Sequence, residues 1–312
     1  MYDRIPINNS ILNSWVGSVF KQYGLDSDFE DTFWGMAKNN FSTITKRVMI
    51  EKCEYWRNRV VLAEKRSEFS DDQFLGGRIR LFQLLNGFRA SIDSLLLAAT
   101  IPAFGTQKVL ELGSGSGVAT IALAARKKNL KIWGLEQQPF MVELSKHNAC
   151  RNQMSDRVQF FEANVADHVD LSIKGHFEHV MANPPHMMQG LGNISPNIMK
   201  AQAKVEGEAK LSHWVNFAVE ALQPGGCLVF IHRPERINEL INLLTPETGN
   251  ISVTHLFAKD DGRPAKRSLI RAYKGEKKSV PQYQQLILHH DDGSYTKKLD
   301  AVLQGGKELI VS

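Results

Sequence analysis

The sequence predicts an α/β fold: a doubly wound, mostly parallel, seven-stranded Rossmann-like sheet with an antiparallel edge hairpin, preceded by an N-terminal helical extension. Two observations lead to this prediction. Between residues 107 and 232, short apolar runs alternate with segments of helical periodicity, which is typical of parallel strands joined by crossover helices. A glycine-rich turn also follows the first of these apolar runs, at the place where nucleotide-binding α/β folds hold their ligand.

Each element of the alternating region has its own signal. Apolar runs predict five strands, at 109–110, 131–135, 158–161, 179–182 and 227–232. Helical spacing predicts three helices, at 118–126, 139–151 and 212–222. The last helix meets Pro224-Gly225-Gly226, which we expect to stop it. Residues 251–257 and 268–273 are strand-like without a helix between them, and we expect them to form the antiparallel edge hairpin.

Two segments precede the alternating region. Residues 8–66 show helical spacing and no strand signal, so we expect a helical extension over residues 1–66 and an α/β domain over residues 67–312. Gly76-Gly77 predicts a turn, and the alternation of residues 78–82 favours a short hairpin closed by it. Asp93 opens an apolar helix, because acidic residues stabilise the first helical turn.

The composition is that of an ordinary globular protein, with 43% hydrophobic and 23% charged residues among 312. No apolar run approaches the roughly eighteen residues of a membrane span, and the N-terminus lacks the pattern of a signal peptide. The three cysteines, Cys53, Cys150 and Cys227, are far apart and form no C-x-x-C. They favour a reducing compartment and give no reason to expect a bound metal. We therefore expect a cytoplasmic protein.

The net charge of +5 favours a polyanionic partner such as RNA. Residues 46–66 contain seven basic and three acidic residues with aromatics between them, and fit either a solvated helix face or an RNA-facing arm. Residues 259–267 form a basic loop between the two edge strands. This loop is either a solvated turn or a substrate-binding loop whose Arg263, Lys266 and Arg267 contact phosphates. His232-Arg233 ends the fifth strand at the same sheet edge.

Glu111-Leu112-Gly113-Ser114-Gly115-Ser116-Gly117 links a predicted strand to a predicted helix. Glycines let a backbone approach a ligand closely and adopt positive φ, and a helix N-terminus offers unpaired N–H groups. The spacing is G-x-G-x-G rather than the G-x-G-x-x-G of dinucleotide sites. Because an acidic residue precedes the turn, the pattern fits a cofactor with a cationic amino-acid part, such as S-adenosyl-L-methionine (SAM), better than a pyrophosphate.

Two further strand ends carry candidate cofactor residues. Glu136 ends the second strand, 23 residues after Gly113, and a carboxylate there can accept both hydroxyls of a ribose. Gln137 adjoins it in the same expected site. Asn164 follows the third strand, where its amide could hydrogen-bond an adenine rim, with Asp167 as a competing candidate.

Asn183-Pro184-Pro185-His186 follows the fourth strand and forms the predicted catalytic segment. Proline has no N–H and a fixed φ, so two in succession stiffen a loop. The Asn183 side-chain oxygen and the Pro184 carbonyl can then accept both protons of an exocyclic amine, which positions its lone pair for reaction. His186 stands where an aromatic ring would stack on a base. It can also titrate, so stacking and proton transfer both remain open roles.

Together these segments resemble class I SAM-dependent N-methyltransferases with an N-P-P-[YF] motif, in particular the bacterial tRNA(Val) adenosine-N6 methyltransferase group. The likeness to that group also rests on Leu75-Gly76-Gly77-Arg78, Gln83, Gly87-Phe88-Arg89-Ala90 and residues 92–99, and it spans about residues 70–275. It implies N6-methylation of an adenine in tRNA. It also implies SAM as cofactor in a pocket lined by Arg89, Asp93, Glu111, Gly113, Ser114, Gly115, Gly117, Glu136, Gln137, Asn164 and Asn183. His186 stands where the group has Tyr or Phe, and Asn164 where Asp is frequent.

The N-P-P loop alone leaves alternatives open. It also serves N5-glutamine methyltransferases of release factors, which carry a helical N-terminal region, and rRNA guanine-N2 methyltransferases. A catalytically inactive RNA-binding protein with this fold is the non-enzymatic alternative. Residues 75–99 favour the tRNA group, and the presence of Glu111, Glu136 and Asn183 favours an enzyme.

Overall fold

The computed structural model describes residues 69–85, 89–167, 172–185 and 209–310 of the chain. The predicted helical extension over residues 1–66, with its basic stretch, lies outside the described residues, and so does His186. The division of the chain after residue 66 therefore stays a prediction.

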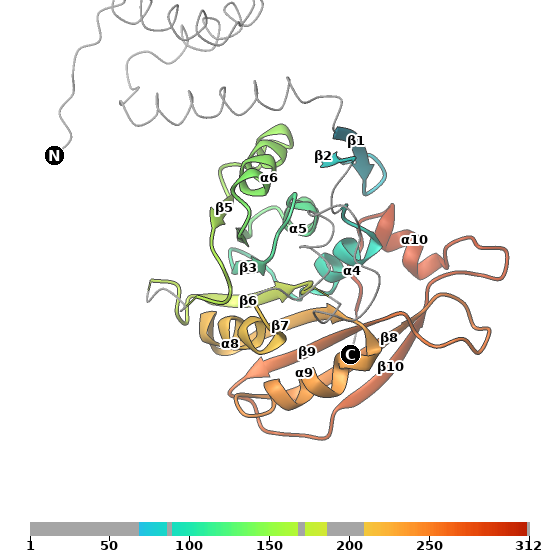
Figure 1. The fold of residues 1–312 in the computed structure, drawn as a ribbon. Helices are drawn as coiled ribbons and strands as arrows, with labels where there is room; N and C mark the ends of the chain where they lie inside the picture. Colours follow the sequence, from blue (N-terminus) through green and yellow to red (C-terminus); the bar gives the residue numbers. More distant parts are fainter. Residues whose placement is uncertain (1–68, 86–88, 168–171, 186–208, 311–312) are drawn as a thin grey trace, which may run out of the picture. The chain divides into compact units, whose positions relative to one another are not determined.

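An eight-stranded sheet forms the centre of the described α/β unit (Figure 1), in the order β10-β8-β9-β7-β6-β3-β4-β5. Its strands are β3 (Lys108–Leu112), β4 (Lys131–Glu136), β5 (Val158–Glu162), β6 (Phe177–Ala182), β7 (Leu222–His232), β8 (Thr248–Phe257), β9 (Arg267–Lys274) and β10 (Gln282–Ile287). Only the two pairs that involve β9 are antiparallel among these strands. The predicted mostly parallel, doubly wound sheet is confirmed.

Two details of the sheet differ from the sequence prediction. The hairpin β8–β9 forms as predicted, but β10 pairs parallel with β8 and adds an eighth strand, so this hairpin is not at the edge. The signal of β10 is weak because Leu286 is its single buried residue. Pro224-Gly225-Gly226 does not separate helix from strand. It lies within β7, where the pairing with β6 shifts register between Phe177 and His179.

Helices cover both faces of the sheet and divide the core in two. Val109 packs with α4 (Ile92–Thr100), α5 (Val118–Arg126), α6 (Pro139–Arg151) and α10 (Lys297–Leu303). The next residue, Leu110, packs with α8 (Leu211–Ala221) and α9 (Ile237–Leu244), because successive strand residues face opposite sides. The sequence did not predict α9, which follows a short 3₁₀ turn, η2 (Pro234–Arg236). Within the described residues, no helix is long and apolar enough to cross a membrane.

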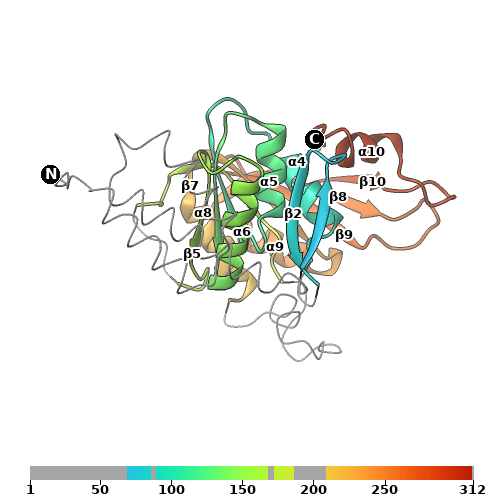
Figure 2. The same ribbon diagram turned by 90° about the horizontal axis from the view of Figure 1, so that it is seen from above.

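A separate two-stranded hairpin stands beside α6 (Figure 2), formed by β1 (Phe69–Phe74) and β2 (Ile79–Leu84). Its turn places Leu75, Gly76 and Gly77 at positive φ, as the glycine pair predicts. An isolated hairpin has marginal stability in water. Here the buried Asn148 of α6 accepts from the Phe82 N–H at 2.8 Å and donates to the Phe82 carbonyl at 3.0 Å, which holds β2 against α6.

Candidate active site

A cavity of about 630 Å³ lies at the carboxyl ends of the parallel strands, within the range of about 300–1,000 Å³ typical of small-molecule sites. Glu111 of β3, Glu136 of β4, Asn164 after β5 and Asn183 after β6 all line it. Residues separated by tens of positions meet here because parallel strands end at the same sheet edge. The structure thus brings together four of the residues that the sequence singles out.

The glycines of the turn at residues 113–117 have two different roles: some allow close packing of neighbouring side chains, and one leaves space for a ligand. Gly113 and Gly117 have positive φ, and an added Cβ would lie 2.6 Å from Trp214 and 2.8 Å from Phe160, respectively. Gly115 also has positive φ, but an added Cβ there would meet nothing within 4 Å. Gly113 and Gly115 line the cavity, whereas Gly117 is the N-cap residue of α5 and does not belong to the lining. Gly115 is therefore the turn residue whose open side a cofactor can approach.

The carboxylate of Glu136 has a fixed orientation. Its Oε2 accepts from the Gly115 N–H at 3.0 Å, and its Oε1 accepts from the Gln138 N–H at 2.9 Å. Only 8% of the residue is exposed, and burial raises its pKa, against the lowering effect of these backbone hydrogen bonds. Each carboxylate oxygen can accept more than one hydrogen bond. The remaining acceptor sites suit a pair of ribose hydroxyls in the cavity.

Glu111 is an almost fully buried acid in the same cavity. Its Oε2 accepts from the backbone N–H of Thr120 at 2.9 Å and also from the Thr120 hydroxyl. Burial raises the pKa of Glu111 to about 8, against the opposite effect of the Thr120 hydrogen bonds, and the charge of Glu136 adds to the increase. A cation near this carboxyl group would favour its ionised form. Glu111 therefore fits a cofactor that carries an ammonium or sulfonium group.

Asn164 is held in a local turn at the cavity wall. Its Oδ1 accepts from the Ala166 N–H at 3.0 Å, which leaves the side-chain NH₂ as the donor that can reach an acceptor nitrogen of an adenine ring. The competing candidate Asp167 is exposed and does not line the cavity, whereas Asn164 and Gln137 do.

Asn183 and Pro185 line the cavity from the end of β6. The Asn183 Oδ1 is buried and has no hydrogen-bond partner among the described residues. A buried acceptor without a partner costs about 1–3 kcal/mol. An amine donor bound in the cavity would remove this cost, so the free carbonyl oxygen fits a nitrogen substrate.

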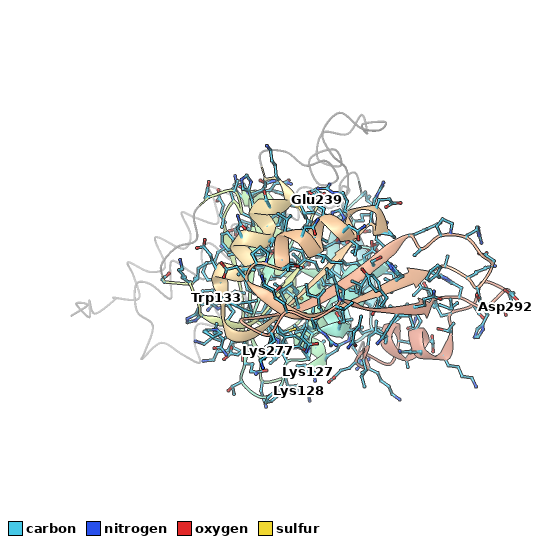
Figure 3. The ribbon with its side chains drawn as sticks, turned by 90° about the horizontal axis from the view of Figure 1, so that it is seen from below. Lys127, Lys128, Trp133, Glu239, Lys277 and Asp292 are labelled. Carbon is cyan, nitrogen blue, oxygen red and sulfur yellow. The ribbon has the colours of Figure 1, made fainter. Side chains whose placement is uncertain are left out.

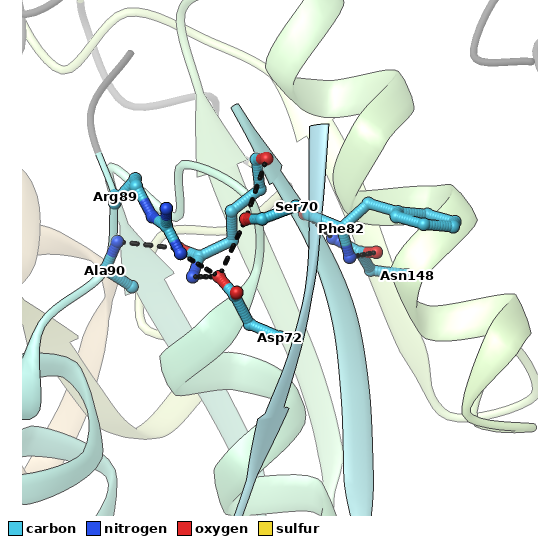
Figure 4. A network of polar contacts seen from close by, with 7 residues as sticks. Ser70, Asp72, Phe82, Arg89, Ala90 and Asn148 are labelled. Carbon is cyan, nitrogen blue, oxygen red and sulfur yellow. Dashed lines mark hydrogen bonds and ion pairs between the residues drawn. The ribbon is translucent and has the colours of Figure 1, made fainter. Parts of the chain in front are cut away.

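Arg89, predicted as a pocket residue, contacts the hairpin instead (Figure 4). Its guanidinium lies 2.6 Å from Asp72 Oδ2, which also accepts from Gln83 Nε2 at 2.6 Å and Ser70 Oγ at 3.1 Å. Gln83 Oε1 in turn accepts from the Ala90 N–H at 2.7 Å. Ala90 lines the cavity and Arg89 does not. The network therefore fixes one wall of the cavity from outside it.

Asp93 also lies outside the cavity lining. Its Oδ2 accepts from Arg267 Nε at 2.8 Å. Asp93, which we predicted to bind the cofactor, therefore pairs with Arg267, which we predicted to bind phosphate. Of the other two predicted basic residues, Arg263 is exposed and pairs with Asp261, and Lys266 is exposed.

The predicted basic loop 259–267 corresponds to the connection 258–266 between β8 and β9, because Arg267 already belongs to β9. This connection lies at the same sheet edge as Asn183. Because β7, β8 and β10 run parallel, the loops after β8 and β10 both leave the sheet where β6 ends. These two loops extend together beyond the sheet (Figures 1 and 3), with Asp292 labelled at the end of the second. Lys259 Nζ donates to the Asp291 carbonyl at 2.7 Å, and the His289 N–H donates to the Ala258 carbonyl at 3.0 Å.

The sequence missed several residues of the cavity wall. Phe140 follows Glu136 by four residues, so its closeness to that strand end was a usable signal. Trp214 gave no such signal, because its position in α8 fits ordinary core packing. Further lining residues that were not predicted include Leu84, Ser94 and Ser116.

The fold and the cavity define a Rossmann-like methyltransferase, and comparison with known proteins gives its family. Residues 89–252, more than half of the chain, match the family model of the methyltransferase small domain, and the chain belongs to this family. It is a SAM-dependent methyltransferase, and S-adenosyl-L-methionine is its cofactor.

Curated relatives carry the name tRNA1(Val) (adenine(37)-N6)-methyltransferase. That of Actinobacillus pleuropneumoniae serotype 7 is 25% identical over 213 residues, covering 67% of this chain and 86% of the relative. That of Haemophilus influenzae PittGG is 25% identical over 210 residues, covering 67% and 87%. Among solved structures, a predicted O-methyltransferase from Agrobacterium tumefaciens has a TM-score of 0.57 and 24% identity, and covers 70% of this chain and 99% of that one. This last likeness shows the fold alone.

Proposed function

We propose that this methyltransferase acts on N6 of an adenine in tRNA. The observation that carries the proposal is the buried Asn183 Oδ1, which has no partner among the described residues and belongs to a residue that lines the same cavity as Glu111 and Glu136. The names of the curated relatives support tRNA as the substrate class and adenine N6 as the acceptor.

The cofactor is assigned to the part of the cavity between β3, β4 and β5. S-adenosyl-L-methionine supplies the methyl group when it is bound. Glu136 accepts the ribose hydroxyls, Glu111 faces the cationic amino-acid part, and the Asn164 NH₂ group donates to the adenine ring. Gly115 leaves room for the cofactor backbone because it has no side chain.

The acceptor amine is assigned to the Asn183-Pro184-Pro185 segment. Asn183 Oδ1 and the Pro184 carbonyl would each accept a hydrogen bond from one N6 hydrogen, which orients the nitrogen for reaction. The amine loses its extra proton after transfer, so no strong base is needed. His186 is assigned to stack on the adenine ring.

An adenine must leave its helical stack to reach this cavity. Unpaired loop bases are the usual targets of sequence-specific RNA recognition, because their edges and faces are accessible. The exposed Arg263 and Lys266, on the loop at the same sheet edge, are assigned to phosphates of the tRNA. An unpaired adenine in the anticodon loop satisfies these requirements.

Transfer of tritiated methyl groups tests the proposal. The purified full chain is incubated with labelled SAM and, in parallel reactions, with tRNA, rRNA or protein extract from cells that lack the gene. The RNA is digested to nucleosides and the protein to amino acids before the label is assigned. We expect the label in N6-methyladenosine, and none with the Asn183→Ala variant. Label in a release-factor glutamine or in N2-methylguanosine of rRNA, with tRNA unlabelled, would establish one of the alternative substrates.

A further inference from the structure

We propose that His232 is a positioning residue that holds the methyl-acceptor segment in its reactive geometry. His232 is the last residue of β7 and is fully buried. Its Nε2 lies 3.2 Å from the carbonyl oxygen of Pro185. The inference rests on the proposed function in one respect: it takes Asn183-Pro184-Pro185 as the segment that binds the acceptor amine.

The acceptor segment needs a hydrogen-bond donor from elsewhere in the chain. Pro184 and Pro185 have no N–H, so this dipeptide offers only carbonyl acceptors. Two prolines restrict the φ angles, but they do not fix the segment relative to the sheet. A side-chain N–H from a neighbouring strand can do so, and His232 supplies one to Pro185.

The sheet register explains why His232 reaches this carbonyl. The β6–β7 ladder ends with Ala182 opposite Phe230. β7 continues for two more residues, and His232 faces the same side of the sheet as Phe230 because side chains alternate along a strand. His232 therefore lies beside the point where the acceptor segment leaves β6.

The chemistry of the contact assigns His232 a role different from acid–base catalysis. A carbonyl oxygen only accepts, so the imidazole carries its proton on Nε2. Burial lowers the pKa of His232 to about 4, and nearby Arg236 adds to the decrease. Backbone hydrogen bonds to Pro185 and Arg233 and the charge of Glu239 oppose it. The ring is thus neutral near pH 7. Its hydrogen bond occupies the Pro185 carbonyl and leaves Asn183 Oδ1 and the Pro184 carbonyl to the amine.

Two variants at His232 distinguish a role of its hydrogen bond in positioning the acceptor segment from a role of its volume in core packing. His232→Leu removes the donor at similar volume, and His232→Gln keeps a side-chain N–H at comparable reach. We expect His232→Leu to lower the single-turnover rate of methyl transfer to tRNA by about 10- to 100-fold, the usual effect of misplacing reacting groups. His232→Gln should recover most of the rate. Calorimetry should give an unchanged SAM affinity for both variants, since His232 does not line the cofactor cavity.

His179 provides a matched control. It is also a buried histidine, with a pKa lowered to about 4 by burial. It lies on the adjacent strand β6 but at its beginning, and its Nε2 is 3.0 Å from Gln107 Oε1. His179→Leu should leave the transfer rate near that of the wild type. Full activity of a folded His232→Leu variant, or a His232→Gln variant as slow as His232→Leu, would overturn the proposal.

A second measurement needs neither RNA nor a variant. In ¹⁵N-histidine NMR spectra of the wild-type chain, His232 should be neutral at pH 7 with its proton on Nε2. A proton on Nδ1 would overturn the inference, even where His232→Leu fails to fold. Absence of methyl transfer from the wild-type chain to tRNA would contradict the proposed function instead, and the NMR result would still decide the role of His232.

Discussion

Asp93, in the first turn of α4, forms an ion pair of 2.8 Å with Arg267, at the start of β9. The two residues are 174 positions apart. Their pairing holds the start of α4 against β9, and the segment just before α4 lines the cavity. Asp93 is 6% exposed. Its charge is therefore balanced mainly by protein groups rather than by water.

Arg267→Ala should reduce the free energy of unfolding by about 1–3 kcal/mol, because it leaves the buried Asp93 carboxylate without its partner. Urea denaturation measures the change. Lys266→Ala is the control: it alters the neighbouring exposed cation and should change stability by less than about 0.5 kcal/mol. Equal, small effects of both substitutions would mean that the pair does not stabilise the fold.

Glu136→Ala should weaken SAM binding by an order of magnitude or more. It removes the two charge-assisted hydrogen bonds that we propose to the ribose, each of about 1.5–3 kcal/mol. Isothermal titration calorimetry checks this, with Glu162→Ala as control, because Glu162 lies directly opposite Glu136 in the β4–β5 ladder but is exposed. Unchanged affinity of the Glu136→Ala variant would rule out the ribose assignment.

SAM affinity should rise as the pH increases from about 6 to about 7.5, by up to roughly tenfold per unit. Burial raises the pKa of Glu111 to about 8 in the free protein, and a bound cation favours the ionised form, so binding releases a proton below that pH. Calorimetry in buffers of different ionisation heat measures this release. Glu111→Gln should flatten the profile, and a flat wild-type profile would contradict the contact with the cation.

The stability of the free protein should change with pH in the opposite direction. The pKa of Glu111 is higher in the folded state, about 8, than its ordinary value of 4.5. The folded chain therefore holds a proton that the unfolded chain loses, and the contribution of Glu111 to stability falls as the pH rises from about 4.5 to about 8. Glu111→Gln should remove this part of the pH dependence in urea denaturation at several pH values.

Asn183→Ala should abolish nearly all methyl transfer, because it removes the acceptor that we propose to orient the amine, while SAM affinity falls much less. At His186, substitution by Phe should preserve much of the single-turnover rate, and substitution by Ala should lose it, since base–aromatic stacking contributes about 1–3 kcal/mol. A Phe variant as inactive as the Ala variant would indicate proton transfer or a specific hydrogen bond. A fully active Ala variant would remove His186 from the site.

RNA affinity should depend on salt through the loop after β8. Each phosphate contact contributes about 0.7–0.9 to the slope of log K against log salt. Replacing Arg263 and Lys266 by Ala should therefore reduce the slope by about 1.5 and leave SAM binding unchanged. The control replaces Lys277 and Lys278, which are exposed at the opposite edge of the sheet, after β9. An unchanged slope in the Arg263 and Lys266 variant would make this loop a solvated turn.

The sequence by itself determined the alternation of strands and helices between residues 107 and 232 and four main cavity residues. The helices 118–126 and 139–151 agree with α5 and α6 because helical periodicity is a local property. Glu111, Glu136, Asn164 and Asn183 could be grouped because each lies at or just after the end of a parallel strand, and such ends share one sheet edge.

Only the tertiary structure decided which distant residues touch. The pairing of Asp93 with Arg267, the contact of His232 with Pro185 and the packing of Trp214 over Gly113 join segments that no local pattern relates. These contacts depend on the lateral order of the strands and on which sheet face each helix covers. Local sequence fixes the spacing of residues within an element, whereas contacts between elements depend on the packing of the whole domain. For this reason the contacts of Arg89, Asp93 and Arg267 could not be predicted from their positions in the chain.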